Sequence, residues 1–142
     1  MKADLSRRLS LEYENYWHKE VAQVPGAWVP ALIDLWKQLD DINTAAPMSS
    51  EHRITWVSLR YMVFPASVTV YATPLANIRM WRPVHAMALI SALDAFHRRV
   101  RETCEECGRR PGFRQKTQLG IGGQDQILCA DCGRKLGGGH PE

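Results

Sequence analysis

The sequence predicts an α+β fold. An N-terminal helical hairpin and a short strand region precede a long helix that leads into a segment with four paired cysteines. Three patterns support this prediction. Apolar residues recur at steps of three and four in 9–39 and 83–103, as on one face of a helix. β-Branched and aromatic residues alternate in 53–72, as in strands. All four cysteines lie in 104–132, in two Cys-x-x-Cys pairs.

Length and composition are those of one ordinary domain. The chain has 142 residues, of which 45% are apolar, and this proportion excludes overall disorder. We expect an α+β core at 1–103, a cysteine-rich segment at 104–136 and a flexible, glycine-rich tail at 137–142. No apolar run approaches the ~20 residues of a membrane helix, and the charged N-terminus lacks a secretory signal. We therefore expect a cytoplasmic protein without a membrane partner.

Two helices are expected in the N-terminal third. The apolar stripe of the first consists of Leu9, Tyr13, Tyr16, Trp17, Val21 and Val24. Pro25-Gly26 ends this helix, and the second begins near Trp28 with Pro30 in its first turn. The stripe of the second helix predicts that Trp28 and Trp36 are buried. Because the connection is short, we expect the two helices to pack as a hairpin, followed by a loop at 43–50.

The segment 53–72 allows two interpretations. Alternation of Thr55, Val57 and Leu59 favours a strand, and a turn beginning at Pro65 would lead into a second strand at 68–72. A buried helix at 50–64 is the alternative, because serines 49 and 50 with the following glutamate also resemble a helix start. We favour the two strands.

The segment 83–103 predicts a long helix that runs directly into the first cysteine. Pro83 suits its first turn, and Leu89, Phe96 and Val100 lie on one apolar stripe. His97 lies on the same helix near the cysteines. We expect this histidine to face solvent, with a role as a spare metal ligand as the alternative.

The cysteine pairs predict a metal site. They consist of Cys104, Cys107, Cys129 and Cys132, with 21 residues between the pairs. Four thiolates form the closed tetrahedral site typical of structural zinc. Gly108 and Gly133 follow the pairs and permit the left-handed backbone of a zinc knuckle. We therefore expect a four-cysteine zinc finger with one structural Zn²⁺ per chain. Free thiols, a redox pair or an iron–sulfur cluster are the alternatives.

The same motifs argue against catalysis. Four cysteines fill every position of a tetrahedral ion, whereas a catalytic zinc usually keeps one position open. The glycine-rich stretch 120–123 lacks the following lysine of a phosphate-binding loop, and it favours a hairpin turn. We expect no catalytic residues, and an enzyme with an unrecognised site is the alternative.

The stretches "CEECG", "GFR" and "LCADC" resemble the C-terminal four-cysteine finger of the DksA/TraR family. That family binds RNA polymerase and inserts a helical coiled coil into its secondary channel. The resemblance implies zinc ligation by the four cysteines, and it covers only 104–136. The family spaces its cysteine pairs more closely, and its Asp-x-x-Asp motif has no counterpart in this chain.

Basic residues gather in the sequence around the first cysteine pair. They are Arg98, Arg99, Arg101, Arg109, Arg110, Arg114 and Lys116. The net charge of +3 lies within 98–142, and four thiolates around Zn²⁺ would reduce the total to about +1. This charge excludes a strongly cationic, DNA-coating protein. The cluster either offsets the thiolate charge or binds a partner through phosphates or an acidic protein surface.

We therefore expect a small non-enzymatic regulator or inhibitor that docks on a larger protein or nucleoprotein complex. RNA polymerase and a CRISPR-type effector are two such complexes, and the regulator could be encoded by a phage or plasmid. A direct DNA- or RNA-binding zinc-finger module is the alternative.

Overall fold

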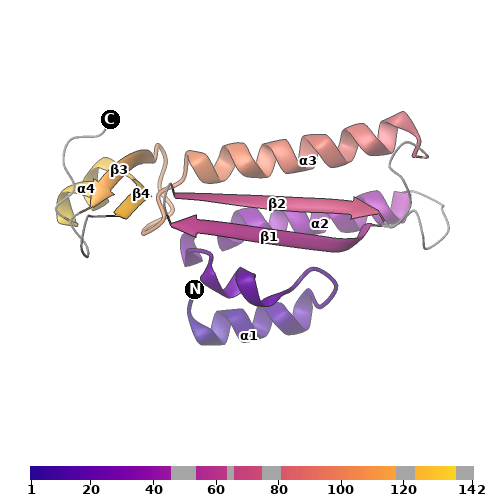
Figure 1. Ribbon diagram of the computed structural model, residues 1–142, viewed down its shortest axis with the longest axis horizontal. Helices are drawn as coiled ribbons and strands as arrows, with labels where there is room; N and C mark the ends of the chain where they lie inside the picture. The colour runs from indigo at the N-terminus through magenta and orange to yellow at the C-terminus, as the bar shows by residue number, and fades with distance from the viewer. Residues whose placement is uncertain (46–53, 64–65, 75–80, 118–123, 137–142) are drawn as a thin grey trace.

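The computed structural model describes residues 1–45, 54–63, 66–74, 81–117 and 124–136. It confirms the predicted α+β combination of helices with a short strand region, and the strands form two antiparallel pairs, β1–β2 and β3–β4 (Figure 1). Helices α2 (Val29–Ala45) and α3 (Pro83–Arg101) pack against each other, and strand β2 (Ala66–Pro74) packs on α3. The cysteine segment lies at one end of this layer. Within the described residues, no helix combines the length and apolar character needed to cross a membrane.

The N-terminal helix is shorter than predicted. Helix α1 covers Ala3–Glu12, and Tyr13 leaves the helical conformation with φ −124° and ψ 44°. The chain continues through two 3₁₀ turns, η1 (Lys19–Gln23) and η2 (Gly26–Trp28), instead of one helix reaching Val24. The apolar stripe misled the prediction because tight turns also bury side chains at three-residue steps.

The predicted burial of Trp28, at the end of η2, and of Trp36, in α2, is confirmed, because each is 1% exposed. The rings of Tyr13 and Tyr16 lie 5.0 and 6.3 Å from the Trp36 ring, and this packing attaches the N-terminal segment to α2. The predicted loop at 43–50 is wrong for 43–45, which are helical, whereas 46–50 lie outside the described residues.

Asn43 lies in the last turn of α2, and its side chain pairs with Ile54, the first residue of strand β1 (Ile54–Val63). This pairing supports the helical conformation at the end of α2. Nδ2 of Asn43 donates to the Ile54 carbonyl at 3.1 Å, and its Oδ1 accepts from the Ile54 N–H at 2.8 Å. This double hydrogen bond fixes the entry into the sheet against the end of α2.

Strands β1 and β2 confirm the strand interpretation of 53–72, and the helix alternative is wrong. They pair antiparallel from Ile54↔Pro74 to Val63↔Ala66. Strand β2 therefore begins two residues earlier than predicted, and residues 64–65 lie outside the description. Val70 and Ala72 are buried, whereas Tyr71 between them is 55% exposed, as alternation in a one-sided sheet requires.

Helix α3 begins at Pro83 as predicted and ends at Arg101, two residues before the expected end. Its buried residues are Leu89, Ala92, Phe96 and Val100. Beyond it, strands β3 (Phe113–Thr117) and β4 (Gln124–Leu128) pair antiparallel and lead into the short helix α4 (Ala130–Lys135). The turn predicted at 120–123 and the tail at 137–142 lie outside the described residues.

Candidate metal centre

The first cysteine pair lies in a tight turn that follows α3. The Cys104 carbonyl accepts from the Gly108 N–H at 3.0 Å, and the Cys104 N–H donates to the Arg109 carbonyl at 3.0 Å. Gly108 has φ +76°, which confirms the left-handed backbone predicted there. This turn brings Cys107 back beside Cys104.

The second pair lies at the start of α4. Cys129 caps this helix: its sulfur accepts from the Cys132 N–H at 3.5 Å, and its carbonyl accepts from the Gly133 N–H at 2.9 Å. The left-handed conformation predicted for Gly133 is wrong, because Gly108 is the one described glycine with positive φ. A Cβ at Gly133 would instead overlap the Gln115 side-chain amide, which would have to shift to make room for it.

All four sulfurs lie within 4.8 Å of one another, and Sγ of Cys107 is 3.6 Å from Sγ of Cys129. A tetrahedral ion with zinc–sulfur bonds of about 2.3 Å requires sulfur–sulfur distances of roughly 3.8 Å. The cluster therefore fits one tetrahedral metal ion. The prediction that Cys104, Cys107, Cys129 and Cys132 come together is confirmed as a group able to hold one metal.

Two thiols of this cluster, Cys129 and Cys132, have pKa values shifted in opposite directions. The backbone N–H of Cys132, helped by the neighbouring thiols, lowers the pKa of Cys129 to about 7. Burial, followed by hydrogen bonds with the other thiols, raises the pKa of Cys132 to about 12. Four sulfurs this close cannot all ionise without a cation among them, and a divalent metal ion supplies that charge.

Several hydrogen bonds tie the two knuckles to each other. Glu105 is buried, with its N–H donating to the Ile127 carbonyl at 2.8 Å and its Oε2 accepting from the Ile127 N–H at 2.6 Å. The Gln115 amide donates to the Leu128 carbonyl at 3.0 Å. Strand β4 is therefore fixed to the first knuckle before it reaches Cys129. The unit 104–136 is called the finger below.

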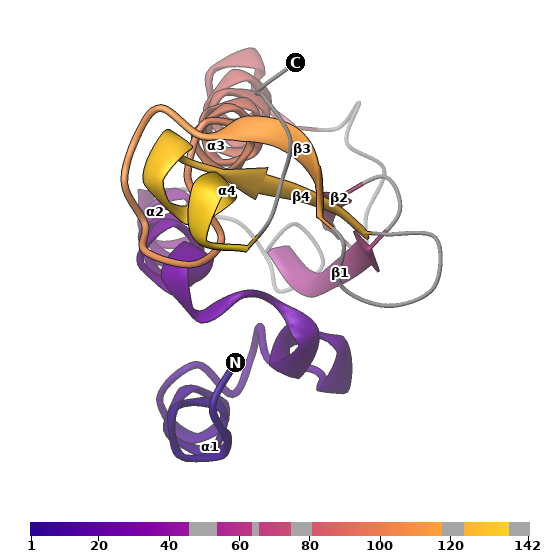
Figure 2. The same ribbon diagram turned by 90° about the vertical axis from the view of Figure 1, so that its left-hand side faces the viewer.

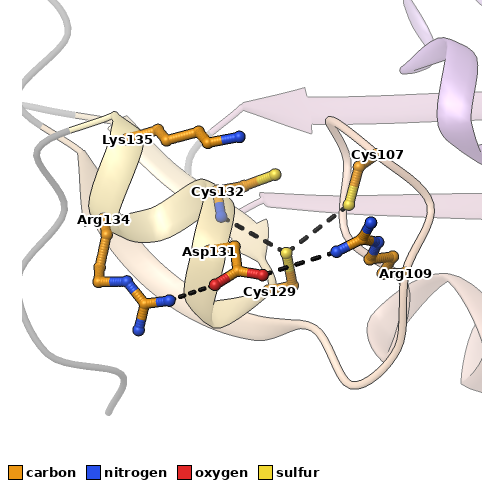
Figure 3. Close-up of a pocket in the computed structure, with 7 residues that line it drawn as sticks. All are labelled: Cys107, Arg109, Cys129, Asp131, Cys132, Arg134 and Lys135. Carbon is orange, nitrogen blue, oxygen red and sulfur yellow. Dashed lines mark hydrogen bonds and ion pairs between the residues drawn. The ribbon is translucent and has the colours of Figure 1, made fainter.

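A shallow pocket of about 270 Å³ opens beside the cysteines. Its lining consists of Cys107, Arg109, Cys129, Asp131, Cys132, Arg134 and Lys135 (Figure 3). Arg109 lies 3.6 Å from Asp131, and Arg134 contacts the other oxygen of the same carboxylate. The sequence interpretation included Arg109 and missed Arg134 and Lys135. Their position directly after the second cysteine pair was the signal that could have identified them.

The remaining predicted basic residues have different surroundings. Arg99 forms a 2.5 Å ion pair with Asp34 of α2, so it serves the helix–helix interface. Arg101 donates from Nε to the His97 carbonyl at 3.2 Å. Three of the predicted basic residues are exposed and form no ion pair within the described part of the chain: Arg98, Arg110 and Arg114. Lys116 lies on β3 opposite Asp125 in the register.

The solvent-facing position predicted for His97 is wrong. The ring is half-buried, and its Nε2 accepts a hydrogen bond from the Val70 N–H at 3.0 Å. Burial, followed by the charge of Arg101, lowers the pKa of His97. Among the described residues, the metal group consists of cysteines, so His97 is no part of it.

Comparisons with protein-family models, curated proteins and solved structures find no match. The resemblance to the DksA/TraR finger therefore rests on the four-cysteine site and shows no family membership.

Proposed function

We propose that the finger binds one structural zinc ion through Cys104, Cys107, Cys129 and Cys132. Two observations support zinc: the four sulfurs lie within 4.8 Å of one another, close enough to surround one ion, and each pair lies in a turn held by backbone hydrogen bonds. All-thiolate tetrahedral sites favour zinc among the common divalent ions. With four thiolates bound, the ion has no open position for substrate, so its role is to stabilise the fold.

We further propose that the protein is a non-enzymatic regulator or inhibitor that docks through the finger on an anionic surface of a larger complex. The observation that carries this proposal is the uneven charge of the finger surface. Five described cations are exposed: Arg109, Arg110, Arg114, Arg134 and Lys135. The exposed carboxylates among the described residues of the finger are Glu106 and Asp131, because Glu105 and Asp125 are buried.

An acidic protein surface is the partner that this charge fits best. The thiolates of a zinc site would cancel two positive charges, so long-range attraction to nucleic acid is weak. A short-range contact in which arginines pair with carboxylates does not need a large net charge. RNA polymerase and CRISPR-type effectors present such surfaces next to bound nucleic acid, and we propose them as the settings to examine first.

The experiment is affinity capture from a bacterial lysate at physiological salt, followed by mass spectrometry. Arg110→Glu with Arg114→Glu reverses two exposed cations of the finger that have no ion pair in the described chain. Arg8→Glu with Lys37→Glu makes the same change of charge on α1 and α2. We expect the native protein and the helix variant to capture the same partner, and the finger variant to lose it. Equal capture by both variants would contradict docking through the finger.

A salt series separates this proposal from the nucleic-acid alternative. Direct phosphate binding predicts that log affinity for duplex DNA falls with log salt at a slope of about −0.9 per contact. We expect dissociation constants above about 10 μM for generic DNA and RNA at physiological salt, in the range of non-specific contacts. Tight, sequence-selective binding would replace the docking proposal with a nucleic-acid module.

A further inference from the structure

A second pocket lies where the finger meets the core. Its volume is about 380 Å³, and it is bounded by α3, β2, η2 and β4. Figure 2 looks at the molecule from the finger end, where β3 and β4 lie across the ends of α3 and of the β1–β2 pair. Small-molecule sites occupy pockets of roughly 300–1,000 Å³ that combine apolar walls with a few polar groups. This pocket has both features.

Its apolar wall consists of Trp28, Val100 and Ile127, and each is at most 4% exposed. The Trp28 indole donates to the Thr103 carbonyl, just beyond the end of α3. Glu105, two residues after Thr103, accepts a hydrogen bond from the Ile127 N–H and so holds Ile127 in place. The apolar wall therefore lies at the C-terminal end of α3, which is also where Arg101 stands.

The polar wall offers two donors at this end. Because Nε2 of His97 accepts from the Val70 N–H, the neutral ring carries its proton on Nδ1, which is then a donor. Arg101 donates from Nε to the His97 carbonyl, and no carboxylate pairs with its guanidinium within the described residues. By contrast, Arg99 two positions earlier is paired with Asp34.

The pocket also contains one acidic group, Asp94, which stands three residues before His97 on α3 and seven before Arg101. The separation of Asp94 from Arg101 corresponds to about 10 Å along a helix at 1.5 Å per residue. Thr69 of β2 completes the lining. The cationic group of the pocket, Arg101, therefore stands beside the apolar wall, about two helical turns from Asp94.

We propose that this pocket binds a small amphipathic anion, in which an apolar body carries one carboxylate or phosphate group. Arg101 and the Nδ1–H of His97 hold the anionic group, and the apolar body lies against the wall formed by Trp28 and Ile127. This site shares no residue with the metal pocket or with the docking surface of the finger.

The metal and this pocket are physically coupled. Ile127 belongs to β4, and its position depends on the Glu105 contact within the first knuckle. Loss of the ion would release the knuckles and remove the β4 wall. Anion binding should therefore require the metal-loaded finger.

The test is an NMR titration of the ¹⁵N-labelled, zinc-loaded full chain with two aromatic probes. 3-Phenylpropionate carries the carboxylate, and 3-phenylpropylamine has the same apolar body with a cation. We expect saturable shifts of the Trp28 indole signal and of the Val100 and Ile127 amides with the carboxylate. The dissociation constant should lie in the millimolar range of such small fragments, and the amine should bind at least tenfold more weakly. Phenyl phosphate provides the phosphate arm.

Arg101→Gln should weaken carboxylate binding at least tenfold, whereas the matched Arg98→Gln, outside the pocket lining, should leave it unchanged. Both residues are exposed, so both variants should keep the native spectrum. Chelation of the metal should abolish the shifts. The proposal is overturned if neither anion gives saturable shifts at these residues, if the amine binds equally well, or if Arg98→Gln and Arg101→Gln behave alike.

Discussion

The indole N–H of Trp28 donates a hydrogen bond of 2.9 Å to the backbone carbonyl of Thr103, in the buried interior. Trp28 is the last residue of η2, and Thr103 directly precedes the first cysteine of the metal group. The bond therefore joins the core to the base of the finger. It also explains why Trp28 lies at the junction between the core and the finger.

Trp28→Phe should destabilise the protein by roughly 1–3 kcal/mol more than Trp81→Phe, because it leaves the Thr103 carbonyl without this donor. Trp81 is a matched control: it is also buried, and its indole nitrogen has no partner within the described structure. Urea unfolding of both variants gives the comparison. Equal losses of stability would mean that the Trp28 hydrogen bond contributes nothing beyond packing.

Gly108→Ala should cost about 1–2 kcal/mol, the penalty for an L-residue in the left-handed conformation. Space is not the reason, since a Cβ at this position meets its nearest atom at 3.8 Å. Gly26→Ala is the control, because nothing lies within 4 Å of its Cβ position. Thermal melts of the metal-loaded proteins test the difference, and competition with a chelator should show weaker metal binding for Gly108→Ala alone.

Glu105→Ala should lower metal affinity by roughly tenfold or more, as loss of a supporting contact outside the ligands commonly does. The substitution removes the acceptor for the Ile127 N–H and so weakens the attachment of β4 to the first knuckle, although the backbone N–H of residue 105 still donates to the Ile127 carbonyl. Glu105→Gln keeps an acceptor oxygen and should retain most of the affinity. Chelator competition measures both variants, and identical affinities for the alanine and glutamine variants would exclude this supporting role.

The lowered pKa of His97 predicts that the folded protein loses stability as the pH falls. Its pKa in the folded protein is lowered by burial and by Arg101, while Asp94 opposes the shift. Below about pH 6.5, the ordinary histidine pKa, the unfolded chain takes up a proton that the folded chain does not. The free energy of unfolding should therefore fall as the pH decreases from about 6.5 toward the folded pKa.

His97→Gln isolates this contribution, since glutamine can still accept from the Val70 N–H without titrating. The difference in unfolding free energy between native protein and variant should shift in favour of the variant as the pH falls. Taking the difference removes the acid sensitivity that the cysteine site adds to both proteins. A difference that stays constant between about pH 7.5 and 5.5, a window that spans the ordinary histidine pKa, would contradict the assignment.

Local patterns predicted the parts of this fold that depend on local chemistry. The cysteine spacing identified all four members of the metal group, and the apolar stripe of the second predicted helix identified Trp28 and Trp36 as buried. Pro83 marked the start of α3 correctly. Within each cysteine pair, along the stripe of the second helix and at Pro83, the deciding residues lie within a few positions of one another.

Other errors came from contacts between residues that are distant in the sequence. Asn43 at the end of α2 pairs with Ile54 of β1, and the half-buried His97 ring accepts the Val70 N–H of β2. Arg99 looked like a partner-binding residue until Asp34, far away in the sequence, proved to be its ion-pair partner. No window of local sequence contains these partners, so periodicity and composition could not reveal them.

The proposed role of the four cysteines is to fold the finger around one metal ion. It is tested most directly by native mass spectrometry of the purified chain, combined with amide NMR before and after chelation. We expect one zinc ion per chain and, after its removal, loss of the dispersed signals of 104–117 and 124–136 while α2 and α3 keep theirs. A metal-free chain in which those finger signals stay dispersed and unshifted would contradict this role.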